Sequence, residues 1–222
     1  MIAENSKDLF DDAGVVDYYT EKRSLIFGET RLLEELAPSL RGARILDLGV
    51  GAGRTTPFFL KCSPKRYVGV DCAPNMVARC QECFPGPDFR VADARNLVEF
   101  QDGDFDFVMF SWNGIDYVDH AGRDRVISEV FRVLSPGGCF VFATANGRRL
   151  PPRPWSREVI RNMDLSMTPR SILYGAKEWI RGCWNYARRA RHELTTEDYN
   201  IRIDSAHNFS VIRYFITPEK QA

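Results

Sequence analysis

Three glycines at alternate positions follow an acid in the segment RILDLGVGAGRTT, residues 44–56. The acid is Asp47 and the glycines are Gly49, Gly51 and Gly53. Glycine weakens the interior of an element, so this spacing predicts positive φ angles or a close approach of a ligand to the backbone. The acid at the loop entry would repel a pyrophosphate and attract an ammonium. The segment therefore predicts a loop that binds a cationic ligand against bare amides, with a tight ligand-free turn as the alternative.

Two further carboxylates stand where predicted strands end. Asp71 closes RYVGVD, 20 residues beyond Gly51, where a carboxylate can accept hydrogen bonds from both hydroxyls of a ribose. Asp93 closes FRVAD next to Ala94, where an acid can accept a hydrogen bond from the exocyclic amine of adenine. These positions predict that the ligand of the glycine loop carries an adenosine.

Strands and helices alternate along the first two thirds of the chain. Predicted strands cover residues 45–48, 66–71, 89–93, 105–112 and 139–145, and predicted helices cover 15–26, 29–37, 54–62, 73–84 and 120–134. The strands are nearly continuous in apolar residues, as in sheets covered on both faces, and the spacing suits right-handed crossovers. The fold class predicted is α/β, a doubly wound, mostly parallel, Rossmann-like sheet with ligands beyond the carboxyl ends of its strands.

Composition places the chain among globular proteins and reveals one charged block. The 222 residues carry a net charge of zero, yet residues 148–191 hold eleven basic and three acidic side chains. No apolar run is long enough to span a bilayer and the amino terminus lacks a signal-peptide pattern, so a cytoplasmic protein is expected. The six cysteines read as free thiols, and Cys80 and Cys83 lack the second ligand pair of a zinc site.

The ordered motifs resemble the class I S-adenosylmethionine-dependent methyltransferases. The matching segments are ILDLGVGAGRTT, YVGVDCAPNMV, VADARNL, FDFVMFSWNGIDYV and RVLSPGGCFVFATAN, within about residues 40–146. The resemblance implies S-adenosylmethionine as cofactor and S-adenosylhomocysteine as product. It implies cofactor contacts from Asp47, Gly49, Gly51, Gly53, Asp71, Cys72, Met76, Asp93, Ala94, Ser111, Trp112 and Asn113. The glycines would hold the amino-acid part, Cys72 and Met76 the adenine, and residues 111–113 the sulfonium end.

The sequence says less about the residues that would bind or activate the methyl acceptor. Tyr18 and Tyr19 are expected to close the site, and Asp116, His120 and His207 are candidate general bases. Asp116 could instead be a loop acid bonded to backbone, and Asp119 or His120 could cap the following helix. The segment SWNG replaces the Pro-Pro motif of base-amino methyltransferases, no Pro-Cys dipeptide occurs, and the paired glutamates of arginine methyltransferases are absent. A small-molecule O or N acceptor and no nucleic-acid partner are therefore expected.

Residues 148–207 are expected to form a helical cap inserted after a core of residues 1–147. A helical stripe is predicted to turn inward, with Trp179 and Trp184 over the acceptor pocket. The stripe comprises Ile172, Ala176, Trp179, Ile180, Cys183, Trp184 and Ala187. A pocket wall for an anionic acceptor is the next alternative. No membrane partner is expected, although the basic helix 171–192 leaves contact with an acidic membrane or nucleic acid open.

Residues 208–222 are predicted to form a return strand and the first turn of a helix, with Thr217 as cap and Pro218 at the first position. The resemblance implies a longer helix and two more strands there, so the carboxyl-terminal strands are expected to be missing. Two other functions remain open: a non-catalytic S-adenosylmethionine-binding protein or truncated inactive methyltransferase, and a nicotinamide-dependent oxidoreductase.

Overall fold

A computed structural model describes residues 7–161 and 168–221, which divide into two compact units. The core unit comprises residues 7–115 and 119–143, and the C-terminal unit comprises residues 116–118 together with the described residues from 144 onward. The division after residue 143 lies close to the boundary predicted at 147. The assignment of residues 116–118 to the C-terminal unit is not visible in the sequence.

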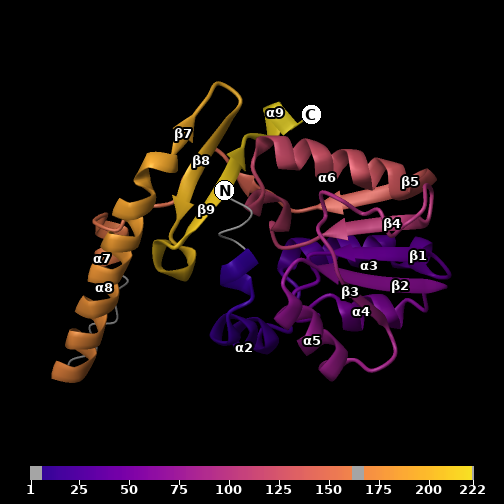
Figure 1. The fold of residues 1–222 in the computed structure, drawn as a ribbon, viewed down its shortest axis with the longest axis horizontal. Helices are drawn as coiled ribbons and strands as arrows, with labels where there is room; N and C mark the ends of the chain where they lie inside the picture. The colour runs from indigo at the N-terminus through magenta and orange to yellow at the C-terminus, as the bar shows by residue number, and fades with distance from the viewer. Residues whose placement is uncertain (1–6, 162–167, 222) are drawn as a thin grey trace. The chain divides into compact units, whose positions relative to one another are not determined.

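The core unit contains a five-stranded parallel sheet with flanking helices (Figure 1). The strand order is β3-β2-β1-β4-β5. The strands are β1 Arg44–Leu48, β2 Arg66–Asp71, β3 Asp88–Val91, β4 Phe105–Phe110 and β5 Leu134–Phe142. The order reverses direction at β1, so the loops after β1 and β4 open the crevice where such sheets bind ligands. The predicted Rossmann-like fold class is confirmed.

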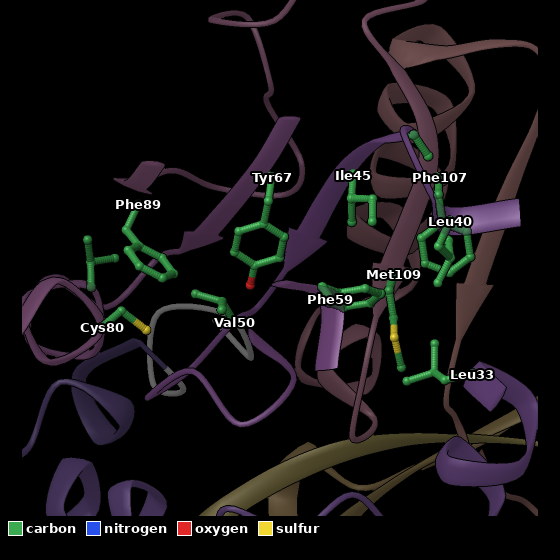
Figure 2. Packing of buried hydrophobic residues seen from close by; sticks show 12 residues of the cluster. Leu33, Leu40, Ile45, Val50, Phe59, Tyr67, Cys80, Phe89, Phe107 and Met109 are labelled. Atoms are coloured by element: carbon green, nitrogen blue, oxygen red, sulfur yellow. The ribbon is translucent and has the colours of Figure 1, made fainter. Parts of the chain in front are cut away.

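Five helices of the core unit follow the predicted positions. They are α2 Ala13–Glu21, α3 Phe27–Leu40, α4 Thr56–Lys61, α5 Pro74–Cys83 and α6 His120–Val133. Asp12 caps α2 and Asp119 caps α6, whose Gly122 N–H donates to the Asp119 carboxylate at 2.8 Å. The helices bury apolar residues against the sheet, and Figure 2 shows Ile45 of β1, Phe59 of α4 and Tyr67 of β2 in this cluster.

The fifth strand begins earlier than predicted. Strand β5 starts at Leu134, directly after α6, and Leu134 pairs with Phe105 while Cys139 pairs with Phe107. The segment SPGG, residues 135–138, is therefore a bulge between two paired residues, with Gly137 at φ +80°.

The C-terminal unit contains a second sheet of order β6-β9-β8-β7. Its strands are β6 Ala145–Asn146, β7 Leu194–Thr195, β8 Tyr199–Asp204 and β9 Val211–Ile216, and its helices are α7 Arg157–Arg161, α8 Pro169–Arg189 and α9 Pro218–Gln221. The predictions of a return strand and of a helix starting at Pro218 are confirmed. The helical prediction for 148–207 is wrong at its end, because β7 and β8 occupy residues 194–204. Part of the predicted cap, 162–167, lies outside the described residues.

Helix α8 packs on a face other than the predicted stripe. Its buried residues are Gly182 and Tyr186, while Ile180 and Trp184 of the predicted stripe are exposed. A Cβ at Gly182 would lie 2.4 Å from the Asn208 side chain, so the turn Ala206–Phe209 approaches too closely for any larger residue. The prediction was wrong for Ile180 and Trp184 because it assumed that the largest apolar residues would be buried. The buried contact is made at Gly182, where only a residue without a side chain fits.

Candidate functional site

The three glycines of the β1–α4 loop have different roles. All have positive φ, at 60°, 56° and 84° for Gly49, Gly51 and Gly53. A Cβ at Gly49 would lie 2.6 Å from the Phe110 ring, and one at Gly53 would lie 2.5 Å from the Phe84 ring. A Cβ at Gly51 would meet nothing within 4 Å. Close packing therefore explains the outer glycines, whereas Gly51 borders the open space in which a ligand can approach the backbone.

Asp71 holds the glycine loop through hydrogen bonds to backbone N–H groups. Its Oδ2 accepts from the Gly51 N–H at 2.9 Å, and its Oδ1 accepts from the Ala73 N–H at 2.9 Å. Burial raises the pKa of Asp71, and these backbone hydrogen bonds partly oppose that rise. The Cys80 thiol of α5 donates to the Gly51 carbonyl at 3.1 Å. The position predicted from the sequence for ribose binding thus also fixes the loop conformation.

Asp47 lies fully buried below the loop with one oxygen unpaired. Its Oδ2 accepts from the hydroxyls of Thr55 and Tyr67, at 2.5 and 2.9 Å. Among the described residues its Oδ1 has no hydrogen-bond partner. Burial raises the pKa of Asp47 to about 6, although the two hydroxyls lower it. A buried carboxylate oxygen without a donor matches a site that is completed by a cationic or N–H-bearing ligand.

A buried ion pair beneath the loop was not predicted from the sequence. Arg54 makes a bidentate contact with Glu29 of α3, at 2.5 and 2.8 Å. Glu29 also accepts from the backbone N–H of Ile26 and of Trp112. Burial alone would raise the pKa of Glu29, but the hydrogen bonds and charge of Arg54 outweigh it and lower the pKa. Glu29 accepts from the Ile26 N–H at the start of α3, but Ile26 lacks the side-chain oxygen of a capping-box residue, so the sequence carries no capping signal that marks Glu29.

The residues after β4 have unusual backbone angles. Trp112 and Asn113 lie at φ 45° and 60°, a region that residues other than glycine seldom occupy. The Arg54 guanidinium lies 4.6 Å from the centre of the Trp112 ring and donates to the Ser111 hydroxyl at 3.3 Å. The Tyr19 ring of α2 meets Trp112 edge-on at 5.5 Å. The structure therefore brings together Ser111, Trp112 and Tyr19, and Arg54 contacts the first two of them.

The predicted adenine side is formed at β2, α5 and the segment after β3. Met76 is buried with Ala52 of the loop and Val16 of α2, and Cys72 is half-buried. Burial, with the charges of Asp71 and Asp93, raises the pKa of Cys72 to about 12. Asp93, beside Ala94, is paired with Arg95 at 2.6 Å, a partner that the sequence did not predict. Burial by itself would raise the pKa of Asp93, but the hydrogen bonds from Arg95 and its charge lower that pKa.

The three candidate bases have different surroundings. Asp116 is fully buried, and its two oxygens accept from the Thr144 hydroxyl and the Ala145 N–H, both at 2.6 Å. This matches the alternative of a loop acid bonded to backbone, because both carboxylate oxygens already accept hydrogen bonds, one of them from a backbone N–H. His207 is half-buried in the C-terminal unit, where burial lowers its pKa. His120 is exposed at the first position of α6, in the core unit with the glycine loop.

The residues predicted to bind the acceptor also differ. Tyr18 is exposed next to Tyr19, with the two rings 5.4 Å apart. Trp179 is half-buried in the C-terminal unit and its indole N–H donates to the Pro154 carbonyl at 3.0 Å. Trp184 is exposed, with the Arg188 guanidinium 4.4 Å from its ring centre. Tyr19 is thus part of the glycine-loop region, while an acceptor role for the two tryptophans stays a prediction.

Comparisons with known proteins agree with this geometry. Residues 45–138 match a family described as a methyltransferase domain. The 2-methyl-6-phytyl-1,4-hydroquinone methyltransferase of Synechocystis sp. is 33% identical over 139 residues, 59% of this chain and 41% of that protein. The solved S-adenosylmethionine dependent methyltransferase from Mesorhizobium loti is 30% identical, covering 56% of this chain and 57% of that one, with a TM-score of 0.50. Residues 45–138 thus match a methyltransferase domain, and these comparisons support a class I S-adenosylmethionine-dependent methyltransferase.

A second curated relative of the methyltransferase is matched over a similar length. The phthiotriol/phenolphthiotriol dimycocerosates methyltransferase of Mycobacterium tuberculosis is 30% identical over 158 residues, 68% of this chain and 54% of that protein. The chain spans about half the length of the curated relatives it matches. In the described parts of the methyltransferase, no helix is both long and apolar enough to cross a bilayer. No group of three or more His, Cys, Asp or Glu side chains suited to a metal occurs in these same parts.

S-Adenosylmethionine, the cofactor of this family, fits the residues present. The open space at Gly51 leaves room for its amino-acid part, and the unpaired Oδ1 of Asp47 is an acceptor for an ammonium in that region. Asp71 retains acceptor capacity for ribose, since its two oxygens carry four lone pairs and have three backbone donors, the N–H groups of Gly51, Ala73 and Cys72. When bound, the cofactor supplies a methyl group on a positively charged sulfur.

The titration of Asp47 predicts a pH effect on cofactor affinity. Because its pKa lies near 6, Asp47 is ionised at pH 8 and gains a proton as the pH falls below about 6. The affinity for S-adenosylhomocysteine should therefore weaken in that range, by up to about tenfold per pH unit, as charge attraction to the ammonium is lost. Calorimetric titrations from pH 5 to 8 would measure this. In Asp47→Asn the loss below pH 6 should disappear, and a persisting slope would show that another group is responsible.

Proposed function

We propose that this methyltransferase transfers a methyl group to an oxygen or nitrogen atom of a small-molecule acceptor. The observation that carries the proposal is the aromatic contact of Tyr19 with Trp112, 5.5 Å between ring centres, at the carboxyl end of β4. That strand end is where the family motif places the sulfonium of the cofactor. Two rings meeting edge-on there provide an apolar wall for a small acceptor, and the amide of Asn113 beside them can orient it.

The residues that follow β4 support a small-molecule acceptor. Ser111, Trp112, Asn113 and Gly114 occupy the position where base-amino methyltransferases carry a Pro-Pro motif. The named relatives also act on small molecules or lipids by their names: a phytyl hydroquinone, phthiotriol dimycocerosates and, for the 27% identical enzyme of Methylobacterium nodulans, trans-aconitate. We therefore favour a low-molecular-weight acceptor over a nucleic acid or protein.

The residues of the chain would contribute alignment more than proton transfer. Arg54 and Glu29 fix Ser111 and Trp112, and Tyr19 covers Trp112, so this region can position an acceptor and keep water away. His120 is the candidate base with a side chain exposed to solvent. A base is required only if the acceptor loses its proton at or before attack. An amine acceptor that is neutral at the working pH would need none.

An acceptor panel with release of S-adenosylhomocysteine as readout tests the proposal. Small phenols, hydroquinones, carboxylic acids and primary amines would be offered with S-adenosylmethionine, alongside a DNA duplex, a transfer RNA and a histone. Turnover with a phenol, acid or amine supports the proposal, and Trp112→Ala should then raise the Michaelis constant of that acceptor. Turnover confined to a nucleic acid or protein would overturn it, as would cofactor binding without turnover on any acceptor in a wide panel.

Asp71→Ala is expected to weaken binding of S-adenosylhomocysteine roughly 10- to 150-fold, since a hydrogen bond to a charged group is worth about 1.5–3 kcal/mol. Part of the loss would come from the freed Gly51 N–H, which Asp71→Asn can still satisfy in part. Asp88→Ala, which removes an acid at the opposite end of the sheet, is the matched control. An unchanged dissociation constant in folded Asp71→Ala, measured by calorimetry, would remove Asp71 from the cofactor site.

A further inference from the structure

One face of helix α8 is packed against other residues of the C-terminal unit. Gly182 and Tyr186 pack against the turn Ala206–Phe209, whose Asn208 side chain donates to the carbonyl and carboxylate of Glu178 at 2.9 and 3.0 Å. Asn185 donates to the Asn208 carbonyl at 2.9 Å. This side of α8 is closed by its own unit and is not available for a ligand.

The opposite face of α8 is apolar and exposed. Leu173, Ile180 and Trp184 are 73%, 62% and 58% exposed. Their spacings of seven and four residues bring them to within about 20° of one line along an α-helix, over a length of about 16 Å. Large apolar side chains scattered singly need no explanation, but an aligned row on one helix indicates an interaction surface. We call these three residues the outer stripe of α8.

Basic side chains border the outer stripe, and acidic ones do not. Arg170, Lys177, Arg181 and Arg188 are all exposed. The single acid of α8, Glu178, is half-buried and engaged by Asn208. The Arg188 guanidinium lies 4.4 Å from the ring centre of Trp184, so one cation is stacked directly on the stripe. The Arg181 guanidinium also lies 3.8 Å from the Glu178 carboxylate, so the outward face of α8 combines an apolar row with an excess of positive charge.

A shallow hollow lies at the amino-terminal end of the outer stripe. It has a volume of about 470 Å³ and is lined by Thr168, Arg170, Ser171, Leu173, Tyr174 and Lys177. Two cations and two hydroxyls surround it, next to an aromatic ring and the first residue of the stripe. This set of groups suits a phosphate-bearing headgroup whose hydrocarbon continues along the apolar row.

We propose that the outer stripe of α8 binds the surface of a bilayer that contains anionic phospholipid. A helix of this kind lies in the plane of the interface, with its apolar row in the acyl boundary, its arginines and lysines at the phosphates, and tryptophan at headgroup depth. A second copy of this chain is disfavoured as the occupant, since a two-fold contact would place Lys177 and Arg181 against identical cations. This proposal is independent of the acceptor proposed above.

Vesicle flotation with the full chain tests the proposal. We expect binding to vesicles with 30% phosphatidylglycerol in phosphatidylcholine, weaker binding to phosphatidylcholine alone, and loss of binding at high salt. The double variant Ile180→Ser/Trp184→Ser should lower the affinity for the anionic vesicles at least tenfold. Phe131→Ser, which removes an even more exposed aromatic residue from α6 of the core unit, should have no effect. Lys177→Glu/Arg181→Glu should reduce binding further than the matched double change Arg31→Glu/Arg125→Glu on α3 and α6.

Several outcomes would overturn the proposal. One is the absence of binding to anionic vesicles, and another is binding that the outer-stripe variant leaves unchanged. A concentration-dependent mass in sedimentation that only the outer-stripe variant abolishes would identify a second copy as the occupant. Competition by free glycerol phosphate at the concentration of the lipid phosphate would indicate a soluble phosphate ligand. If the outer-stripe variant fails to fold, tryptophan fluorescence decides the question. Brominated lipid should quench the fluorescence of the unmodified protein, and this quenching should be smaller in Trp184→Phe.

Discussion

Replacing Gly51 with valine is expected to abolish measurable binding of S-adenosylhomocysteine while leaving most of the fold intact. A Cβ at this position would enter the open space that the structure leaves beside the loop, where nothing lies within 4 Å. The valine would also strain a backbone at φ +56°, at a cost of about 1–2 kcal/mol. Calorimetry would measure binding, and urea unfolding would measure the strain.

The matched control for this substitution is Gly42→Val. Gly42 has φ +71° and nothing within 4 Å of a Cβ, but it lies before β1, at the opposite end of the strand from the glycine loop. It should lose a similar amount of stability and keep its affinity for S-adenosylhomocysteine. Equal binding by Gly51→Val and Gly42→Val would show that the loop is a turn without a ligand.

The cofactor half of the molecule could be predicted because its signals are local. Buried parallel strands read as apolar runs, which placed Asp71 correctly at the end of β2, whereas β3 ends at Val91, two residues before the predicted end at Asp93. The glycine loop needs three residues without side chains at fixed spacing. Each feature depends on residues close in sequence, and so the alternation of strands and helices and the position of the loop followed directly.

The missed features depend on residues far apart in sequence. Glu29 and Arg54 are 25 positions apart, and only the packing of α3 beside the loop makes them a pair. Likewise, the buried side of α8 is set by the turn at Asn208, which no periodicity within the helix reveals. Strand β8 alternates buried Ile201 and Ile203 with half-buried Arg202, yet the preceding helical run led to a helical prediction.

The glycine loop and the end of β4 are connected through one buried charge pair. Arg54 belongs to the segment after the glycines, and it contacts Ser111 and Trp112, which follow β4. Glu29 neutralises this arginine and also accepts from the Trp112 N–H at 3.3 Å. Cofactor loop and proposed acceptor wall therefore share a support, and a change at Glu29 should be felt by both.

Glu29→Ala is the substitution with the largest expected effect on stability. It leaves the Arg54 guanidinium buried without its carboxylate, and breaking one partner of a buried pair costs about 3–5 kcal/mol. Glu35→Ala on the same helix breaks the exposed pair with Arg31, 3.9 Å apart, and should cost less than about 0.5 kcal/mol. Urea unfolding at pH 7 would compare the two variants. A loss below 1 kcal/mol in Glu29→Ala would mean that Arg54 finds solvent or another acceptor.

The pH dependence and a double replacement separate the charge from the packing. Since pairing lowers the pKa of Glu29 below that of the unfolded chain, its stabilisation is present above about pH 4.5 and is lost as the pH falls further. The difference between the unmodified protein and Glu29→Ala should therefore shrink toward pH 3. Glu29→Leu/Arg54→Met removes both charges and should be more stable than Glu29→Ala, because no lone charge stays buried. It should still bind S-adenosylhomocysteine more weakly than the unmodified protein, because Ser111 and Trp112 lose the arginine that holds them.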